Sequence, residues 1–321
     1  MGLLITGGCG FIGSNFVRYV LDKHPTHTVI NLDKLTYAGN TDNLRDVEEH
    51  HKPRYEFVKG DICDKRLVRR LMEHSDMVVH FAAETHVDNS IKSADEFMHT
   101  NVFGTYNLLN AAREMKIKRF LYVSTDEVYG SIEEGKFSED SPVAPNNPYS
   151  ASKAGADLMC RAYFRTFDLP VIITRSANNL GPYQHPEKLI PKFVINAMLD
   201  KPLPLYGDGM HSRDWIYVED NCAAIDFALQ NGDAGEVYNI GGDNEHRNID
   251  ITKKILKILN KPESLINHVT DRPGHDRRYA LSSSKIKGLG WKPRFKFDDA
   301  LNNTVNWYKE NKWWWEKLRK E

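Results

Sequence analysis

Residues 3–14 read LLITGGCGFIGS, and this stretch decides the fold. An apolar run comes first, glycines with GxxGxxG spacing follow it, and an amphipathic segment continues over residues 14–21. Glycines between a strand and a helix let the backbone approach a pyrophosphate at the helix N-terminus, where the amides and the helix dipole favour an anion. The sequence therefore predicts a dinucleotide site in this turn. Its expected contacts are Gly7, Gly10, Phe11, Ile12 and Gly13.

An acidic residue ends the second predicted strand, over residues 28–32. Asp33 follows that strand twenty positions after Gly13, where a carboxylate can accept hydrogen bonds from both hydroxyls of an adenosine ribose. The same carboxylate would repel the additional phosphate of NADP, so we expect NAD, although the neighbouring Lys34 weakens this argument. Lys34 and Thr36 complete the expected contacts on this side.

Apolar runs alternate with helical patterns up to about Arg175. Runs that are apolar on both faces suit parallel strands covered by helices on each side. The sequence therefore predicts an α/β fold with a Rossmann-type doubly wound parallel sheet. Further strands are expected at residues 56–58, 77–82, 120–124 and 171–174. Residues placed at the carboxyl ends of the third and fourth strands, beside the cofactor, are Asp61, Ile62, Ala82 and Ala83.

Beyond Arg175 prolines and glycines become frequent, and only one convincing helix is predicted, near residues 190–199. A strand-like run at 237–240 and an apolar-periodic segment at 251–259 follow. We expect a smaller C-terminal substrate lobe that is interrupted by a return to the first domain. The expected limits are 1–176, rejoined by about 217–245, for the first domain, and 177–216 with 246–321 for the lobe.

The last residues contain Trp313, Trp314 and Trp315 among lysines and arginines. Such a segment could form an interfacial membrane helix. We favour a terminal helix that docks its aromatic side chains on the body of the protein, with the last helix packing on the first domain, because basic side chains can extend along an apolar surface to reach water.

Composition argues against several classes of protein. Lys and Arg number 43 against 44 for Asp and Glu, so no broad field would attract nucleic acid or an acidic membrane. The four cysteines are scattered, which excludes a disulfide framework or a thiolate zinc site and favours a reducing cytoplasm. Neither a membrane-spanning run nor a signal peptide is expected. The histidines at positions 24, 27, 50 and 51 lack converging partners, so we expect no metal site.

Tyr149 and Lys153 are spaced i and i+4, so on a helix they share one face. A phenol titrates near pH 10 in water, about three units above neutrality. A neighbouring ammonium and the charge of a nicotinamide would favour the phenolate and make Tyr149 a usable base. An isolated YxxxK pattern is usually a solvated helix face, but here it follows a nucleotide-binding turn.

Four motifs give the chain a resemblance to a known family: LDKLTYAGN at 32–40, HFAAETHVDNS at 80–90, TDEVYG at 125–130 and RPGHDRRYA at 272–280. Together with the glycine turn they make the chain similar to the extended short-chain dehydrogenase/reductases over nearly its whole length. The resemblance implies NAD beside a triad formed by Thr125, Tyr149 and Lys153, and a homodimer joined through helices that flank the sheet.

The adjacent acids Asp126 and Glu127 point to one branch of that family, because hydride transfer alone needs no pair of carboxylates. The resemblance implies an enzyme that removes water from dTDP-glucose, a hydro-lyase. Oxidation at C4 acidifies the C5 hydrogen, so a base can remove it while an acid protonates the C6 hydroxyl. By resemblance Glu127 is the base and Asp126 the acid. These roles require opposite protonation states, so we expect a raised pKa for Asp126.

The diphosphate of a nucleotide sugar needs local donors in a nearly neutral protein, and arginine binds such oxygens bidentately. Arg213 is the first candidate, since it lies in SRDWIYVED at 212–220, which resembles the family's diphosphate-binding stretch. Asn178 is expected beside the nicotinamide. The other residues expected at the substrate are Thr85, His86, Thr125, Asn179, Lys188, Leu189, Pro204, Tyr206, Asn248, Arg272 and His275.

Three alternatives stay open at this point. A nucleotide-sugar 4-epimerase would share the glycine turn and the Tyr149–Lys153 pair, but it has no use for two adjacent acids. A UDP-sugar 4,6-dehydratase is not separable by residue physics, which does not decide between thymine and uracil. A non-catalytic protein that senses NAD is disfavoured by the intact pair. Thymidine sugars feed surface polysaccharides, rhamnose above all, and some natural products, so the pathway stays open between rhamnose biosynthesis and the formation of natural products.

Overall fold

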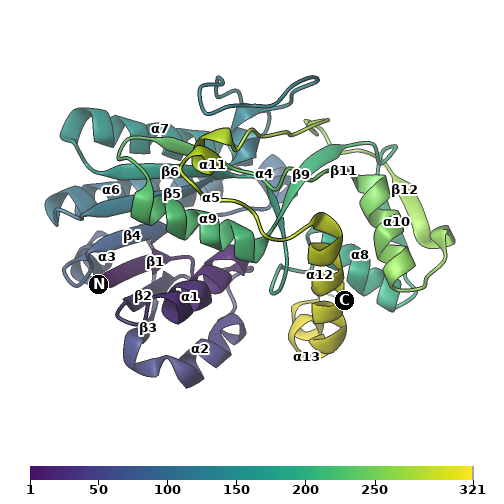
Figure 1. The fold of residues 1–321 in the computed structure, drawn as a ribbon, viewed down its shortest axis with the longest axis horizontal. Coiled ribbons are helices and arrows are strands. Elements are labelled where there is room, and N and C mark those ends of the chain that lie inside the picture. The colour runs from purple at the N-terminus through teal and green to yellow at the C-terminus, as the bar shows by residue number, and fades with distance from the viewer. Residues whose placement is uncertain (320–321) are drawn as a thin grey trace.

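The computed structural model describes residues 1–319, and its centre is a seven-stranded sheet (Figure 1). The strands are β1 (Gly2–Thr6), β2 (Thr28–Asp33), β3 (Tyr55–Lys59), β4 (Met77–His80), β5 (Arg119–Thr125), β6 (Val171–Ser176) and β10 (Val237–Ile240). Their order is β10-β6-β5-β4-β1-β2-β3, and all neighbours run parallel. The predicted Rossmann-type fold is confirmed. Strand order reverses between β1 and β4, and ligands bind outside the carboxyl ends at such a point.

Helices cover both faces of this sheet. One face carries α1 (Phe11–Lys23) and α9 (Val218–Asn231), and the other carries α3 (Lys65–Met72), α6 (Thr105–Glu114) and α7 (Pro148–Phe167). Leu3 and Ile5 join the first core while Leu4 joins the second, because successive side chains of a strand point to opposite faces. The runs that looked apolar throughout are therefore buried on both sides, as expected for parallel strands.

A smaller unit stands beside the carboxyl edge of the sheet and lies to the right in Figure 1. Its strands are β7 (Asn178–Leu180), β9 (Ser212–Tyr217) and β11 (Glu245–Arg247) in one sheet, and β8 (Leu203–Tyr206) with β12 (Ile266–Val269) in another. Its helices are α8 (Leu189–Met198), α10 (Asn248–Ile258), α12 (Phe297–Glu310) and α13 (Lys312–Trp315). They share a core that includes Phe193, Trp215 and Leu301.

The chain returns to the large sheet after β9, since α9 packs on α1 and β10 pairs with β6. We therefore propose the division into residues 1–176 rejoined by about 217–245, and 177–216 with 246–321. One later segment departs from it. The short helix α11 (Ser284–Gly288) and Trp291 are buried in the core of the first unit.

Some sequence predictions need correction. The third and fourth strands end at Lys59 and His80, so the two residue pairs expected to close them lie in the loops that follow. Helix α9 has 14 residues and was not expected, because its buried polar residues Asp220, Asn221 and Asp226 hide the helical period of its apolar face. Those side chains have partners in the fold, for example Asp226 with Lys23 and His24.

The terminal tryptophans are divided between core and surface. Trp314 and Trp315 are buried and Trp313 is exposed. The indole Nε1 of Trp314 donates a hydrogen bond to Oδ1 of Asn43, which belongs to the first unit. Within residues 1–319 no helix combines the length and the apolar character that crossing a membrane requires.

Candidate active site

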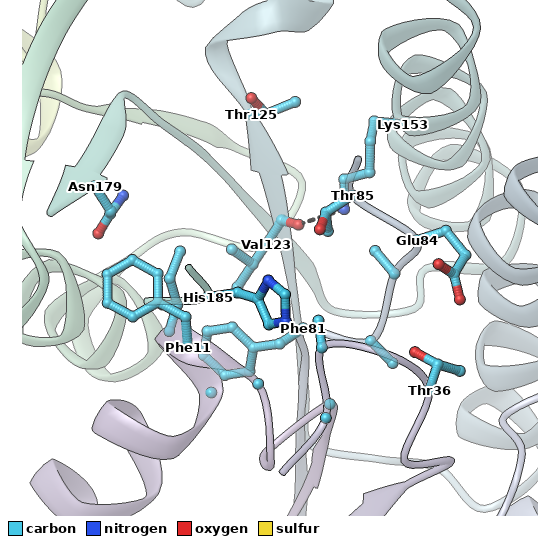
Figure 2. A pocket seen from close by; sticks show the side chains of 18 of the residues that line it. Phe11, Thr36, Phe81, Glu84, Thr85, Val123, Thr125, Lys153, Asn179 and His185 are labelled. Carbon is cyan, nitrogen blue, oxygen red and sulfur yellow. Dashed lines mark hydrogen bonds between the residues drawn. The ribbon is translucent and has the colours of Figure 1, made fainter. Parts of the chain in front are cut away.

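A cavity of about 360 Å³ opens at the carboxyl edge of the sheet, between the two units (Figure 2). This volume is within the usual range for small-molecule sites. In Figure 2, Phe11, Phe81 and Val123 come from the sheet side, while Asn179 and His185 face them from the smaller unit. The residues expected at the cofactor all line this cavity, namely Gly7, Gly10, Phe11, Ile12, Gly13, Asp33, Lys34, Thr36, Asp61, Ile62, Ala82, Ala83, Tyr149, Lys153 and Asn178.

The glycine turn fits closely around its neighbours. Gly7 has φ +73°, and a Cβ there would lie 2.6 Å from the backbone nitrogen of Ala82. A Cβ on Gly13 would lie 2.2 Å from the carbonyl oxygen of Gly7. Gly10 caps α1 without a side-chain hydrogen bond, and the first turn of α1 has no acidic residue. The amides at this helix end therefore offer a site for an anion such as a pyrophosphate.

Asp33 is held in one orientation at the end of β2. Its Oδ2 accepts the amide of Cys9 at 2.9 Å, and its Oδ1 accepts the amide of Leu35 at 2.8 Å. Burial raises the pKa of Asp33, although both hydrogen bonds act to lower it. Lys34 forms an ion pair with Asp61 at 2.9 Å, so its charge is balanced locally. Because Asp61 balances the charge of Lys34, this lysine attracts the additional phosphate of NADP less, and the repulsion by Asp33 favours NAD.

Tyr149 begins α7, and its side chain is buried beside the end of β5. A hydrogen bond with Thr125 lowers the pKa of Tyr149, but burial and then the charges of Glu127 and Asp126 raise it well above its usual value. The expectation that Lys153 and the charge of a bound nicotinamide together favour the phenolate concerns the site with NAD in place, and it stays a prediction.

The side chain of Lys153 is buried and lines the cavity. Its Nζ donates a hydrogen bond to the carbonyl oxygen of Val123 at 2.8 Å, drawn dashed in Figure 2, and lies 4.3 Å from the ring centre of Tyr122. Burial lowers the pKa of Lys153 to about 8. The ammonium thus retains hydrogen-bonding capacity for a ligand, because it has three donors and, among residues 1–319, only the oxygen of Val123 takes one of them.

The acid pair lies in a short 3-10 helix, η4 (Asp126–Tyr129), which Thr125 caps through the amide of Glu127. Glu127 lines the cavity, and its Oε2 accepts a hydrogen bond from the hydroxyl of Ser150 at 3.1 Å. Asp126 is 2% exposed, and its Oδ2 has no hydrogen-bond partner. Burial and the charge of Glu127 raise the pKa of Asp126 well above its usual range. Burial therefore favours the protonated form of Asp126, beside the more accessible carboxyl group of Glu127.

Five residues expected at the substrate line the same cavity: Thr85, Thr125, Asn179, Lys188 and Leu189. The Nζ of Lys188 donates a hydrogen bond to the carbonyl oxygen of Thr85 at 3.0 Å. Its pKa is lowered, mainly by burial, although the charges of Glu187 and Glu127 act to raise it. Lys188 thus brings a partly exposed positive charge close to Glu127.

Seven further expected residues do not line the cavity: His86, Pro204, Tyr206, Arg213, Asn248, Arg272 and His275. Three of these residues form hydrogen bonds with the carboxylates of Asp88 and Asp271 instead. The hydroxyl of Tyr206 and the Nη1 of Arg272 each donate to Asp88 at 3.3 Å. His275 bonds to Asp271 at 2.6 Å, and its ring stacks on His211. Because Asp88 and Asp271 accept these bonds, the residues form a separate polar group next to the cavity.

Arg213 is less available to a diphosphate than its motif suggested. Its guanidinium donates at 2.8 Å to the carbonyl oxygens of Ser212 and Asp276, and it packs over the ring of Tyr279 at 4.2 Å. Its positive charge lowers the pKa of Asp126 against the larger effect of burial. Arg213 therefore lies near the acid pair and stabilises negative charge there.

Comparisons with known proteins settle the family. A family model described as GDP-mannose 4,6 dehydratase matches residues 4–304. The chain belongs to this family. Its predicted place among the extended short-chain dehydrogenase/reductases is confirmed.

Three similar proteins of this family show how far the similarity extends. The chain is 56% identical to the low-salt glycan biosynthesis protein Agl12 of Haloferax volcanii, covering 96% of this chain and 98% of that protein. It is 50% identical to a dTDP-glucose 4,6-dehydratase of Streptomyces niveus, covering 99% and 96%. The crystal structure of DesIV, a dTDP-glucose 4,6-dehydratase of Streptomyces venezuelae with NAD and TYD bound, has a TM-score of 0.97 at 52% identity, covering 99% and 100%.

Glu84 and Asn101 are two of the residues at the site that were not expected from the sequence. Glu84 lines the cavity, and Asn101 fixes its backbone, accepting from the amide at 2.8 Å and donating to the carbonyl oxygen at 3.1 Å. Asn101 also donates to Ser152 of α7. It lies in a π-helical turn, η3 (Met98–Gly104), and such turns are frequent at functional sites. No sequence period marks a π-turn, whereas Glu84 directly follows two residues that were expected.

Proposed function

We propose that this member of the 4,6 dehydratase family converts dTDP-glucose to dTDP-4-keto-6-deoxyglucose, with NAD as its cofactor. One observation carries the proposal. Asp126, which is buried and has a raised pKa, lies beside Glu127, which lines the cavity. Both residues follow strand β5, and both influence the pKa of Tyr149. Elimination of water needs an acid and a base in addition to the tyrosine that serves oxidation at C4, whereas a 4-epimerase has no use for this second pair. The relatives named as dTDP-glucose 4,6-dehydratases support the same conclusion.

The cavity fits NAD on the features of the chain itself. The uncapped N-terminus of α1 would take the pyrophosphate, and the fixed carboxylate of Asp33 would take the adenosine ribose. Lys153 and Asn178 would contact the nicotinamide half. The remaining proposed contacts are Gly7, Gly10, Phe11, Ile12, Gly13, Lys34, Thr36, Asp61, Ile62, Ala82, Ala83 and Tyr149.

The residues of the site divide the proposed reaction among themselves. NAD, when bound, would act as the oxidant: it would accept a hydride from C4 and later return this hydride to C6. Tyr149, hydrogen-bonded to Thr125, would accept the proton of the C4 hydroxyl as a phenolate, the form that Lys153 and the positive charge of bound NAD would favour. The resulting ketone acidifies the C5 hydrogen, which Glu127 removes. Asp126 would then protonate the C6 hydroxyl, which leaves as water, and when the hydride returns to C6 the protonated Glu127 would return a proton to C5.

We propose that the nucleotide part binds beside the acid pair, where positive side chains gather. Lys188, Arg213 and Arg272 interact electrostatically with Glu127 or with one another, which suits a bound diphosphate. Asn248 has a buried Oδ1 without a partner, and this atom could accept a hydrogen bond from the base. The other proposed substrate contacts are Thr85, His86, Thr125, Asn179, Leu189, Pro204, Tyr206 and His275.

A direct assay tests the function. The protein is mixed with dTDP-glucose in heavy water, and the expected product is a 4-keto-6-deoxy sugar with deuterium at C5 and no net build-up of NADH. UDP-glucose is the matched comparison. Turnover of the UDP-sugar without turnover of dTDP-glucose would defeat the substrate assignment, and a 4-epimer without loss of water would defeat the reaction.

We also propose a homodimer, joined through helices on the α7 side of the sheet. Large apolar side chains are exposed there, namely Ile91, Met98, Phe103, Leu158 and Phe167. Light scattering after size exclusion tests this, and Leu158→Lys should yield monomers. We further propose a cytoplasmic enzyme, which its four free cysteines favour, acting in rhamnose biosynthesis.

A further inference from the structure

The C-terminal segment makes a buried contact with the first unit. In α13 the indole Nε1 of Trp314 donates a hydrogen bond to Oδ1 of Asn43 at 2.7 Å, and 271 positions separate the two residues in the chain. Each side chain is 1% exposed. Asn43 lies in the 3-10 helix η1 (Thr41–Leu44), directly after the loop that follows β2. One bond thus joins the end of the smaller unit to the proposed adenosine side of the cavity.

Asn43 transmits this contact to the glycine turn. Its Nδ2 donates to the carbonyl oxygen of Cys9 at 2.8 Å, and the amide of Asn40 donates to the same oxygen at 3.0 Å. The amide of Cys9 in turn donates to Asp33. Because Cys9 lies between Gly7 and Gly10, Asn43 fixes the turn that we propose for the pyrophosphate.

The same segment holds a second loop of the cavity. The rings of Trp307 and Trp314 pack edge-on against Tyr183, with ring centres 4.7 Å and 5.8 Å apart. The hydroxyl of Tyr308 donates a hydrogen bond to the carbonyl oxygen of Gln184, and Gln184 lines the cavity. The terminal aromatic residues therefore contact the loop after β7 as well as the loop after β2.

We infer that this C-terminal clamp, formed by Trp307, Tyr308 and Trp314, sets how slowly bound NAD leaves the enzyme. The clamp joins one loop of the first unit to one of the second, and a dinucleotide in the cavity lies between the two units. The inference rests on the proposed function, in which the hydride taken from C4 returns to C6 of the same sugar. Loss of the reduced cofactor within a cycle would leave that cycle unfinished. Trp314 acts through Asn43, so it is a positioning residue.

The decisive variant removes one donor and keeps most of the packing. Trp314→Phe loses the indole N–H. Asn43→Leu keeps a similar side-chain volume but loses the hydrogen bonds of Asn43 to both Trp314 and Cys9. Enzyme loaded with labelled NAD is chased with unlabelled NAD, and the release rate is measured by rapid filtration. Loss of a buried hydrogen bond predicts release about tenfold faster in each variant. The double variant should show no further acceleration, because both changes break one path.

Controls separate the clamp from general stability. Trp313→Phe alters the neighbouring exposed ring, whose hydrogen bond to Asn311 and contact with Lys317 stay within the same segment, so its release rate should match the wild type. Melting temperatures are taken with and without NAD. A purely structural role of Trp314 would lower both values equally, whereas the clamp predicts a smaller increase on adding NAD.

The outcomes also separate this inference from the proposed function. Release within twofold of the wild type in both Trp314→Phe and Asn43→Leu, in folded protein that turns over dTDP-glucose, overturns the clamp and leaves the function intact. A wild-type protein that holds no NAD overturns both. Faster release in the two variants, with turnover restored by saturating NAD, supports the clamp.

Discussion

The hydroxyl of Ser150 donates a hydrogen bond to Oε2 of Glu127 at 3.1 Å. Ser150 directly follows Tyr149 in α7, while Glu127 lies in the turn after β5. The residue proposed for oxidation and the residue proposed for elimination are therefore held together by one side-chain contact. Oxidation and elimination must act on adjacent carbons of one sugar, and this contact fixes the spacing between the groups that perform them.

Ser150→Ala should slow turnover about tenfold while changing KM little, because Glu127 loses a donor that orients its carboxylate. Steady-state kinetics with dTDP-glucose measure this effect. Ser93→Ala, at an exposed position that ends α4 (Val87–Lys92), is the control. A tenfold rise in KM at constant kcat would show instead that Ser150 acts in binding the substrate.

Glu127→Gln and Tyr149→Phe should block different steps. Loss of a general base costs about 10²- to 10⁴-fold. Without Glu127 the sugar is oxidised but not dehydrated, so the absorbance of NADH should build up to one equivalent per site in a single-turnover experiment. Without the phenol of Tyr149 no NADH should form. If both variants lose NADH formation equally, the division of roles between Glu127 and Tyr149 is wrong.

The pKa of Lys153 gives a prediction for stability against pH. Burial lowers this pKa from 10.5 to about 8, so between these values the unfolded chain binds a proton that the folded chain does not. Stability contributed by this site therefore rises with pH across that window. The free energy of unfolding of the wild type, relative to Lys153→Met, should increase by about 1 to 3 kcal/mol from pH 8 to pH 10.5.

Denaturant titrations at several pH values measure this difference in NAD-free protein. Lys309→Met, at an exposed position in α12, is the control for the loss of one lysine. A difference between wild type and Lys153→Met that is flat or falls over the same range would contradict the lowered pKa.

Arg175 should be a large contributor to stability. It binds both carboxylate oxygens of Asp157 in α7 at 2.8 and 2.9 Å and donates to the hydroxyl of Tyr129, and the ion pair is almost completely buried. Arg175→Met leaves Asp157 unpaired in the core, which costs about 3 to 5 kcal/mol. Chemical denaturation measures this loss.

The double variant Arg175→Met, Asp157→Leu should regain most of that stability, since no buried charge remains unpaired. Arg45→Met, at an exposed ion pair with Glu49, should change stability by less than about 1 kcal/mol. An Arg175→Met protein as stable as the wild type would show that burial of this pair contributes nothing net.

The sequence by itself determined the parallel-sheet architecture and the kinds of side chain that are available for cofactor binding and catalysis. Strands apolar on both faces and glycines at fixed spacing have few physical solutions, so the parallel sheet, the turn at Gly7 and the acid at Asp33 followed from local pattern. The pair Tyr149–Lys153 needed only helical spacing, so the glycine turn and this pair depend on near neighbours in the chain. The raised pKa of Asp126 was expected from the reaction that the family resemblance implies, but burial in the fold is its main cause.

Only the tertiary structure decided which distant groups meet and how charge is distributed among them. The pKa of Tyr149 in the chain without NAD is raised by burial and by Glu127 and Asp126, which come from another element. Asn101 reaches Glu84 through a π-turn, and Trp314 reaches Asn43 across 271 positions. Such contacts arise from packing between elements, which leaves no period or spacing in the sequence.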